Sequence, residues 1–163
     1  MTSKIKIYFD EFEEEDYHLI AIHTSLEDYR LAYFINKQLP INLKKCDTDL
    51  HVQAKQGETH FKRFFFEDEH EGILWNLIDN KNDISSFKND QVEDLFSQSK
   101  SSFKAITYLL PEYKKVNFFL KIDHLNDSFE ITEIVSKIKT VDKIAMVYAV
   151  EKHTIKNKNN LIF

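Results

Sequence analysis

Glycine and proline are scarce in this sequence, which has two of each among 163 residues. This scarcity excludes collagen-like, linker-like and low-complexity segments, which are rich in one or both. The two glycines, Gly57 and Gly72, are also too far apart for a GxGxxG dinucleotide-binding motif, a Walker A loop or a GxSxG nucleophile elbow. The sequence therefore has no glycine-rich loop that could cradle the phosphates of a nucleotide.

Cysteine occurs once, at Cys46. An intramolecular disulfide, a CxxC zinc site and a four-cysteine iron–sulfur cluster are therefore excluded. Long apolar runs are missing as well: no signal-peptide core precedes the acids that begin at Asp10, and no run approaches the length of a transmembrane helix. We expect a cytoplasmic protein with no cofactor and no membrane association.

Positive charge is in the minority, with 22 lysines and arginines against 27 aspartates and glutamates and a net charge of −5. This balance disfavours non-specific binding of nucleic acid or anionic lipid. Acids cluster at residues 10–16 and 67–71, whereas lysines outnumber acids in residues 137–163. Such runs are typical of solvated loops; the alternative is that they attract oppositely charged surfaces of this molecule or of a partner.

Apolar residues make up 42% of the chain, enough for one hydrophobic core. Segments rich in β-branched and aromatic residues predict strands at residues 4–9, 17–24, 41–52, 59–67, 73–80, 103–110, 116–123 and 144–150. Residues 4–9 and 17–24 are expected to form one hairpin, and residues 59–67 and 73–80 a second one. Because the second pair carries apolar side chains on both faces, it is expected in the centre of a sheet or covered on both sides.

Two amphipathic segments predict helices. In the first, Ser25 is expected as the N-cap, Asp28 as the third helical residue, and Pro40 marks the end. In the second, Asp127 and Glu130 resemble a capping box, and the apolar residues that follow repeat at helical spacing. A third, short helix is expected at residues 91–97, within a polar segment (residues 80–102) that we expect to be flexible.

Together these elements predict an α+β fold with two main helices packed on a mixed or mainly antiparallel sheet. The second helix would connect two strands as a crossover, right-handed if the strands are parallel. We find no repeat and no linker, so one domain is expected over residues 1–156, followed by a C-terminal tail at residues 157–163.

Residues 110–118 read Leu-Pro-Glu-Tyr-Lys-Lys-Val-Asn-Phe. This segment, called the signature segment below, resembles the motif that names the IPExxxVDY family of Bacteroidota. Leu110, Asn117 and Phe118 replace the isoleucine, aspartate and tyrosine of the motif. Residues 25–32 and 159–163 are similar to the family as well. The family has no assigned activity, so the resemblance implies a bacterial cytoplasmic protein but no mechanism.

In physical terms the signature segment predicts a connection between two strands. Pro111 has no N–H to donate and holds the preceding residue in extended geometry, so the first strand should end there. Glu112 is expected to accept backbone N–H groups of the turn or to pair with Lys114 or Lys115. The alternative is a recognition loop in which Glu112, Lys115 and Asn117 contact a partner.

Several groups of reactive side chains have spacings that chemistry could use. Asp47, Asp49 and His51 alternate by two, so on one strand they would share a face that could bind a divalent metal. Cys46 with His51 or His23 could form a thiol nucleophile and its base. Solvent-facing polar residues and a small buried cysteine are the ordinary interpretations, and we assign no catalytic or metal-binding residue.

Residues 62–66, Lys-Arg-Phe-Phe-Phe, resemble a strand that stacks RNA bases on aromatic rings. The acids at residues 67–71 would repel the phosphates, so we expect these rings to pack in the core and nucleic acid to be an improbable partner.

The chain closes on three large apolar residues, Leu161, Ile162 and Phe163, after a polar stretch. Apolar residues at an otherwise polar end need a surface to cover them, either the sheet of the same molecule or another protein or second copy.

The leading hypothesis is a non-enzymatic module that binds a protein partner or itself. Its candidate interaction residues are Glu112, Lys115, Asn117, Leu161, Ile162 and Phe163. One alternative is an enzyme or small-ligand binder whose pocket is built from scattered residues, among them Glu112, Asp49, His51 and tyrosines. A third hypothesis is RNA binding through residues 62–66.

Overall fold

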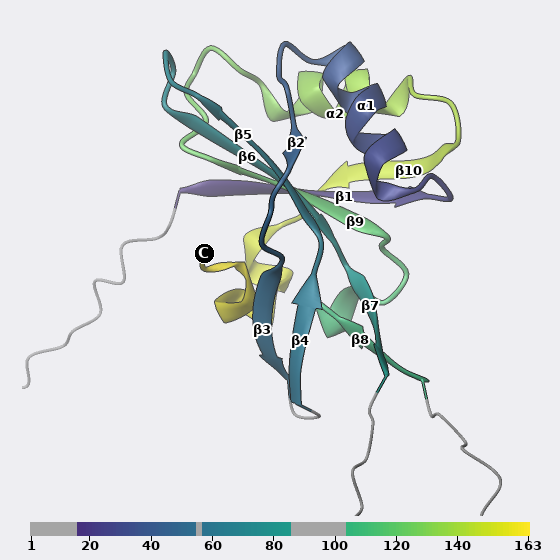
Figure 1. Cartoon of the computed structure of the whole chain (residues 1–163). Coiled ribbons are helices and arrows are strands. Elements are labelled where there is room, and N and C mark those ends of the chain that lie inside the picture. Colours follow the sequence, from purple (N-terminus) through teal and green to yellow (C-terminus); the bar gives the residue numbers. More distant parts are fainter. Residues whose placement is uncertain (1–15, 55–56, 86–103) are drawn as a thin grey trace, which may run out of the picture.

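The computed structural model of the protein describes residues 16–54, 57–85 and 104–163 (Figure 1). Its main feature is a six-stranded sheet in the order β10-β1-β9-β6-β5-β2. The strands are β1 (Tyr17–Thr24), β2 (Lys44–Lys45), β5 (Arg63–Asp68), β6 (Ile73–Asp79), β9 (Phe118–Asp123) and β10 (Ile144–Ala149). All neighbours in this sheet are antiparallel. With two helices packed on it, the predicted α+β class is confirmed.

β1 lies between two strands that come from the last third of the chain. It pairs antiparallel with β9 on one side and with β10 on the other. β9 and β10 are therefore parallel to each other, and the helix between them makes the predicted crossover, with β1 inserted between its two strands. β6 occupies the interior of the sheet between β9 and β5, as its two apolar faces predicted.

Two small two-stranded sheets complete the strand set. β3 (Leu50–Ala54) pairs with β4 (Gly57–Phe61), and β7 (Lys81–Ser85) pairs with β8 (Lys104–Tyr108). Both lie on the side of the large sheet opposite the helices (Figure 1). β3 lies next to the segment that follows β10, residues 150–163, which we call the C-terminal segment. The single strand expected at residues 59–67 is therefore wrong: the chain changes sheets at Lys62, because Phe61 and Phe64 pack into different cores.

The helices α1 (Asp28–Gln38) and α2 (Ile131–Lys139) cover one face of the large sheet (Figure 1). α1 ends before Pro40, as predicted, but its N-cap is Glu27 rather than Ser25. The hydroxyl of Thr24 accepts the N–H of Leu26 and donates to the carbonyl of Lys143, and this turn at the end of β1 delays the helix.

The start of α2 is also later than predicted. Its N-cap is Glu130, not Asp127, and no side chain caps it. Asn126 accepts the N–H groups of Ser128 and Phe129 through its side chain and its carbonyl respectively, so a separate turn precedes the helix. Three short 3₁₀ helices follow the strands: η1 (Pro111–Tyr113), η2 (Lys152–Thr154) and η3 (Lys158–Leu161).

The large sheet separates two apolar cores. On the helix side, Ile20, Ile22, Trp75 and Leu120 pack beneath α1 and α2. On the other side, the alternate residues of the strands pack with the small sheets, the signature segment and the C-terminal segment. This second core includes Leu19, Ala21, Phe61, Ile78, Phe119, Leu109, Leu110, Val116, Ile155 and Leu161. Because side chains alternate along a strand, β1 contributes to both cores.

Some predicted elements lie outside the described residues: the strand at residues 4–9, most of the first acid run, and the helix at residues 91–97. The extended segment predicted at residues 41–52 contains only β2 and the beginning of β3. Neither α1 nor α2, nor any other helix within the described ranges, has the length and apolarity needed to cross a bilayer.

Candidate functional site

The signature segment and the C-terminal segment bind each other within the molecule. The carboxylate of Glu112 accepts the backbone N–H groups of Lys156 (2.7 Å) and Asn157 (3.0 Å), and the side-chain amide of Asn157 (2.8 Å). Burial alone would raise the pKa of Glu112, but hydrogen bonds from its own backbone N–H and from Asn157 and Lys156 together lower it. Glu112 thus acts as an anchor for residues 156–157.

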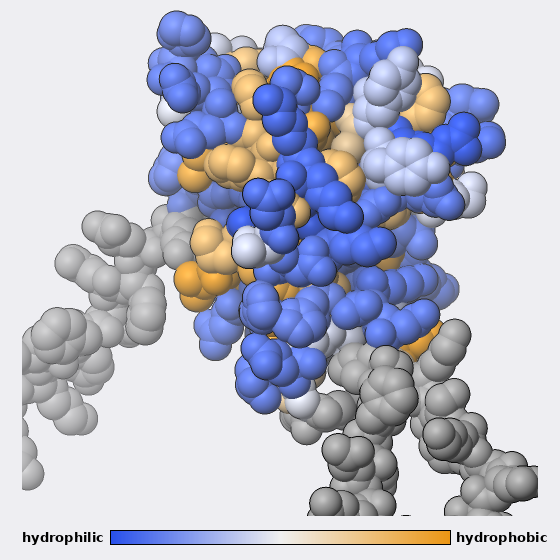
Figure 2. Space-filling view, in the orientation of Figure 1, coloured by the Kyte–Doolittle hydropathy of each residue, from blue (hydrophilic) through white to orange (hydrophobic). Residues whose placement is uncertain are grey.

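The C-terminal residues continue this contact. Asn160 donates its side-chain amide to the carbonyl of Leu109 (2.7 Å). Leu161 is completely buried in the core on that side of the sheet, together with Ile155. The sequence left open whether the apolar end is covered by the same molecule or by another one, and the structure shows Leu161 covered by the same molecule. Ile162 remains 59% exposed and Phe163 41% exposed, and an apolar patch lies in Figure 2 where the C-terminus lies in Figure 1.

A buried asparagine that sequence analysis missed holds the signature segment in place. The side-chain amide of Asn80 donates to the carbonyls of Tyr113 and Val116, and its side-chain oxygen accepts the N–H of Leu110. Asn80 has no exposed surface. An asparagine at the end of a predicted strand gives no sequence signal of such a role, because its partners lie about 30 residues ahead.

The other candidates in the signature segment have different environments. Asn117 accepts the N–H of Thr24 through its side-chain oxygen (3.0 Å), which joins the segment to the end of β1. Lys115 is exposed. Of the residues proposed to contact a partner, Glu112, Asn117 and Leu161 therefore have partners inside the molecule. Lys115 and Ile162 present surface, and Phe163 is partly exposed.

Phe163 covers a group of cations on the sheet. Its ring centroid lies 4.7 Å from Nζ of Lys121 and 5.4 Å from the guanidinium carbon of Arg63. Lys121 is 2% exposed and forms an ion pair with Asp123 at 2.7 Å. Beside it on β6, the side-chain oxygen of Asn76 is buried without a hydrogen bond from the described residues. This polar strip sits inside an otherwise apolar core.

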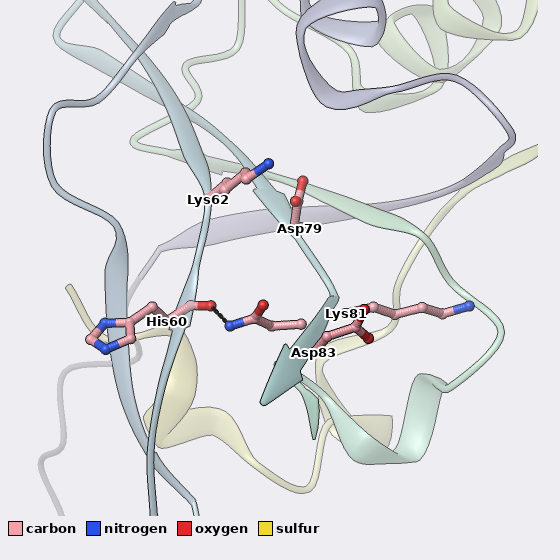
Figure 3. A pocket seen from close by; sticks show the side chains of 6 residues that line it. His60, Lys62, Asp79, Lys81 and Asp83 are labelled. Carbon is pink, nitrogen blue, oxygen red and sulfur yellow. Dashed lines mark hydrogen bonds between the residues drawn. The ribbon is translucent and has the colours of Figure 1, made fainter. Parts of the chain in front are cut away.

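Three shallow hollows have lining residues in common. The first shares Lys62 with the second, and Asp79 and Lys81 with the third. Their volumes are about 300, 360 and 300 Å³. The first is lined by His60, Lys62, Asp79, Lys81, Asn82 and Asp83 (Figure 3). In that view the side chains of Lys62 and Asp79 end near each other, whereas Lys81 extends away from them. Asn82 donates its side-chain amide to the carbonyl of His60 and so links β7 to β4.

Asp79 is the one described carboxyl of these hollows whose pKa is strongly raised, to about 7. Burial is the main cause, and the negative charges of Asp28 and Asp49 add to it. Lys62 and Lys45 act in the opposite direction. A carboxyl of this kind in a hollow is a candidate for proton transfer or ligand binding.

The metal-binding group considered in the sequence does not form on one strand face. β3 begins at Leu50, so Asp47 and Asp49 precede the strand and do not share a strand face with His51. His51 instead lies 3.2 Å from the carboxylate of Glu58 on β4. Within residues 16–54, 57–85 and 104–163, no three metal-ligating side chains come together. Cys46 is half-buried rather than fully buried.

The aromatic rings at residues 64–66 do not form one platform. Phe64 is buried under the helices, Phe66 packs against the same core, and Phe65 alternates to the other face. The predicted packing of these rings in the core describes Phe64 and Phe66 well.

The two edges of the large sheet differ in their protection. β2 forms one edge with two residues, Lys44 and Lys45, both exposed. Short length and lysines are the usual means of preventing edge-to-edge pairing. β10 forms the other edge with six residues, Ile-Ala-Met-Val-Tyr-Ala, and carries no charge. Within the described part of the chain, only β1 pairs with it.

One hydrogen bond next to β10 shows which of its backbone groups face β1 and which face outward. The N–H of Val150 donates to the carbonyl of Leu19 at 2.7 Å. In antiparallel pairs the backbone groups of successive residues point alternately to the two sides, so Tyr148 also faces β1, whereas Val147 and Ala149 face outward. Ala145 is the extra residue of a β-bulge opposite His23 and Thr24. We call the outward side of Ile144–Ala149 the β10 edge.

Comparisons with family models, curated proteins and solved structures gave no match to this chain. The resemblance to the IPExxxVDY family stays a prediction.

Proposed function

We propose that this protein is a non-enzymatic interaction module that binds a protein partner by adding a strand of the partner to the β10 edge. The observation that carries the proposal is the contrast between the two edges of the large sheet. β2 is short and consists of lysines, whereas β10 is longer and uncharged. A strand placed along β10 would satisfy the outward backbone groups of Val147 and Ala149, and main-chain bonds of this kind supply the affinity in strand addition.

The exposed side chains of β10 support the same function. Met146 is 55% exposed, the largest uncovered apolar side chain of this strand. Met146 and Tyr148 are two positions apart on the strand, so both lie on the face opposite the helices, whereas Val147 between them faces the helices. A partner strand would cover Met146 and gain apolar contact in addition to backbone hydrogen bonds.

The contacts of the signature segment bear on where a partner would bind. Glu112 and Leu161 are engaged by the protein's own residues. A partner that used them would first have to displace the C-terminal segment. No residue of the described ranges has to be displaced from the β10 edge, which is why we place the partner there rather than on the signature segment.

Hydrogen exchange with a strand-forming probe tests this proposal. The probe is a synthetic peptide with the sequence of residues 142–152, which carries the uncharged strand between soluble ends. At a protein concentration at which the chain is monomeric, we expect the peptide to slow exchange of the Val147 and Ala149 amides while the amides facing β1 keep their rates. A scrambled peptide of the same composition is the control. Unchanged exchange at Val147 and Ala149 at saturating peptide would contradict the proposal.

A proline variant of the protein provides a second arm. Ala149→Pro removes an outward N–H, a position where an edge strand tolerates proline. We expect this variant to keep its thermal unfolding temperature within a few degrees and to lose peptide binding. The matched variant Ala149→Ser retains the N–H and is expected to bind like the wild type. Full binding by Ala149→Pro would place the peptide elsewhere.

Small-ligand binding is a second candidate, favoured by the raised pKa of Asp79 among three adjoining hollows. The hollows are at the lower end of the volumes typical of ligand sites, and carry both lysines and aspartates. A melting-temperature shift with a panel of carboxylates, amines and phosphates, abolished in Asp79→Asn, would support it. A panel that leaves the melting temperature unchanged would count against it.

A further inference from the structure

We infer that the strand added to the β10 edge is the β10 strand of a second copy of this chain, paired antiparallel about a two-fold axis at Val147. This inference rests on the proposed function and names its partner. A two-fold axis brings the same surface of both copies together, so the edge must be complementary to itself. Three features of the described residues meet this requirement.

The first feature is the backbone. Val147 directs its N–H and carbonyl outward, so two copies related by an axis at this residue exchange both groups with each other. In this register Ala149 lies opposite Ala145 of the second copy, the extra residue of the β-bulge. The chain itself supplies the donors and acceptors that the partner strand needs.

The second feature is the pattern of side chains. In this register Met146 lies opposite Tyr148 of the second copy, and the reverse pair occurs on the other side of the axis. Both pairs combine an exposed or half-exposed apolar side chain with another one. Because Ile144–Ala149 contains no charged residue, no like charges meet within the paired strands.

The third feature is the charge at the two ends of the strand. Lys143 precedes β10, Glu151 follows it, and both side chains are exposed. An antiparallel partner places its Glu151 end against the Lys143 end of the first copy, and the register about Val147 sets these two positions opposite each other. A parallel partner would instead bring lysine to lysine. The ends of β10 therefore favour an antiparallel copy of the same strand.

Charge exchange tests this pairing in the full-length protein. Lys143→Glu places two glutamates opposite each other at both ends of the dimer, and Glu151→Lys does the same with two lysines. We expect sedimentation equilibrium to show dimers of the wild type and association about tenfold weaker for each variant alone. Mixed in equal amounts, the two variants form complementary pairs at both ends, and association should return to the wild-type level.

The controls separate a general effect of charge from this register. The backbone of Lys143 has a φ of 67° and its carbonyl accepts the Thr24 hydroxyl, and neither depends on its side chain. Lys115→Glu changes an exposed lysine of the signature segment by the same charge and should leave association unchanged. Single variants that associate as well as the wild type, or a mixture that does not recover, would overturn the inference.

The result also separates this inference from the proposed function. If the peptide of residues 142–152 protects Val147 and Ala149 but the wild type stays monomeric up to millimolar concentration, strand addition holds and self-pairing is wrong. If neither occurs, both are wrong. If Val147 and Ala149 are already protected in a monomer, and Ile7→Pro removes that protection, the N-terminal segment of the same chain occupies the edge and the inference is overturned.

Discussion

The carboxylate of Glu112 and residue Asn157 are joined by two hydrogen bonds, one from the backbone N–H and one from the side-chain amide of Asn157. The two residues lie 45 positions apart in the sequence, and the structure shows them in direct contact. This contact holds the C-terminal segment against the signature segment, and Leu161 of the same segment is buried in the core.

We predict that Glu112→Gln weakens this anchor. The amide retains one acceptor oxygen but loses the charge that strengthens the bonds, so the free energy of unfolding should fall by about 1–2 kcal/mol. The control is Glu69→Gln, in the exposed turn between β5 and β6. Urea unfolding at pH 7 measures both, and equal stability of the two variants would contradict the prediction.

The same anchor predicts acid sensitivity. Because the pKa of Glu112 is lowered from 4.5 in the folded protein, its contribution is complete above pH 4.5 and disappears as the pH falls through the lower folded value. The difference in stability between wild type and Glu112→Gln should therefore shrink as the pH falls from 5 through the lowered pKa of Glu112. Urea unfolding across this range checks it. A difference that stays constant would mean that charge is not the source.

Two neighbouring apolar residues should respond differently to truncation. Leu161 has no exposed surface and Ile162 is 59% exposed. Leu161→Ala should lower the free energy of unfolding by about 2–4 kcal/mol because it leaves a cavity in the core, whereas Ile162→Ala should change it by less than about 0.5 kcal/mol. Thermal and urea unfolding measure both. Equal effects would indicate that the C-terminal segment does not dock as described.

The buried ion pair on β9 makes a prediction for a pair of variants. Lys121→Met keeps the volume but leaves Asp123 without its cation, at a cost of about 2–3 kcal/mol in stability. Adding Asp123→Asn removes the unpaired charge and should recover part of that loss. A double-mutant cycle by urea unfolding gives the coupling. A double variant as unstable as the sum of the singles would contradict a direct pair.

Asp79 predicts stability that falls with rising pH. Its pKa is raised from 3.8 to about 7 in the folded protein, so between these values the folded state binds more protons than the unfolded state. Stability should decrease as the pH rises through this window and level off above it. Asp79→Asn removes the penalty, so it should stabilise the protein by roughly 2–4 kcal/mol at pH 8 and hardly at pH 4. Thermal unfolding at both pH values checks the sign; a variant that is less stable at pH 8 would refute it.

Local pattern predicted much of the fold. The strands at residues 17–24, 73–80 and 144–150 correspond to β1, β6 and β10 within one residue at each end. These strands could be predicted because the signal, an apolar segment between polar residues, lies within a few consecutive positions of the sequence. The predicted first residues of the helices were wrong because Thr24 and Asn126 use their polar groups to close turns before the helices begin. Such competition is decided by tertiary contacts and not by the cap residues.

The site was harder to predict because its parts are distant in sequence. The acceptor role of Glu112 was expected, but its donors at residues 156–157 were not, and Asn80 was not identified at all. The change of sheet at Lys62 has no sequence signal, since Phe61 and Phe64 are equally suited to one continuous strand. The uncharged composition of β10 is typical of any buried strand, and it indicates a binding edge only because the structure places β10 at the edge of the sheet.

The placement of β1 has a consequence for how this protein is made. Both neighbours of β1 are synthesised more than a hundred residues after it begins. At ordinary translation speeds, roughly 10 s pass between the emergence of β1 from the ribosome and that of β10. During this time β1 has neither of these hydrogen-bonding neighbours, so the sheet closes at the end of synthesis and not in step with it.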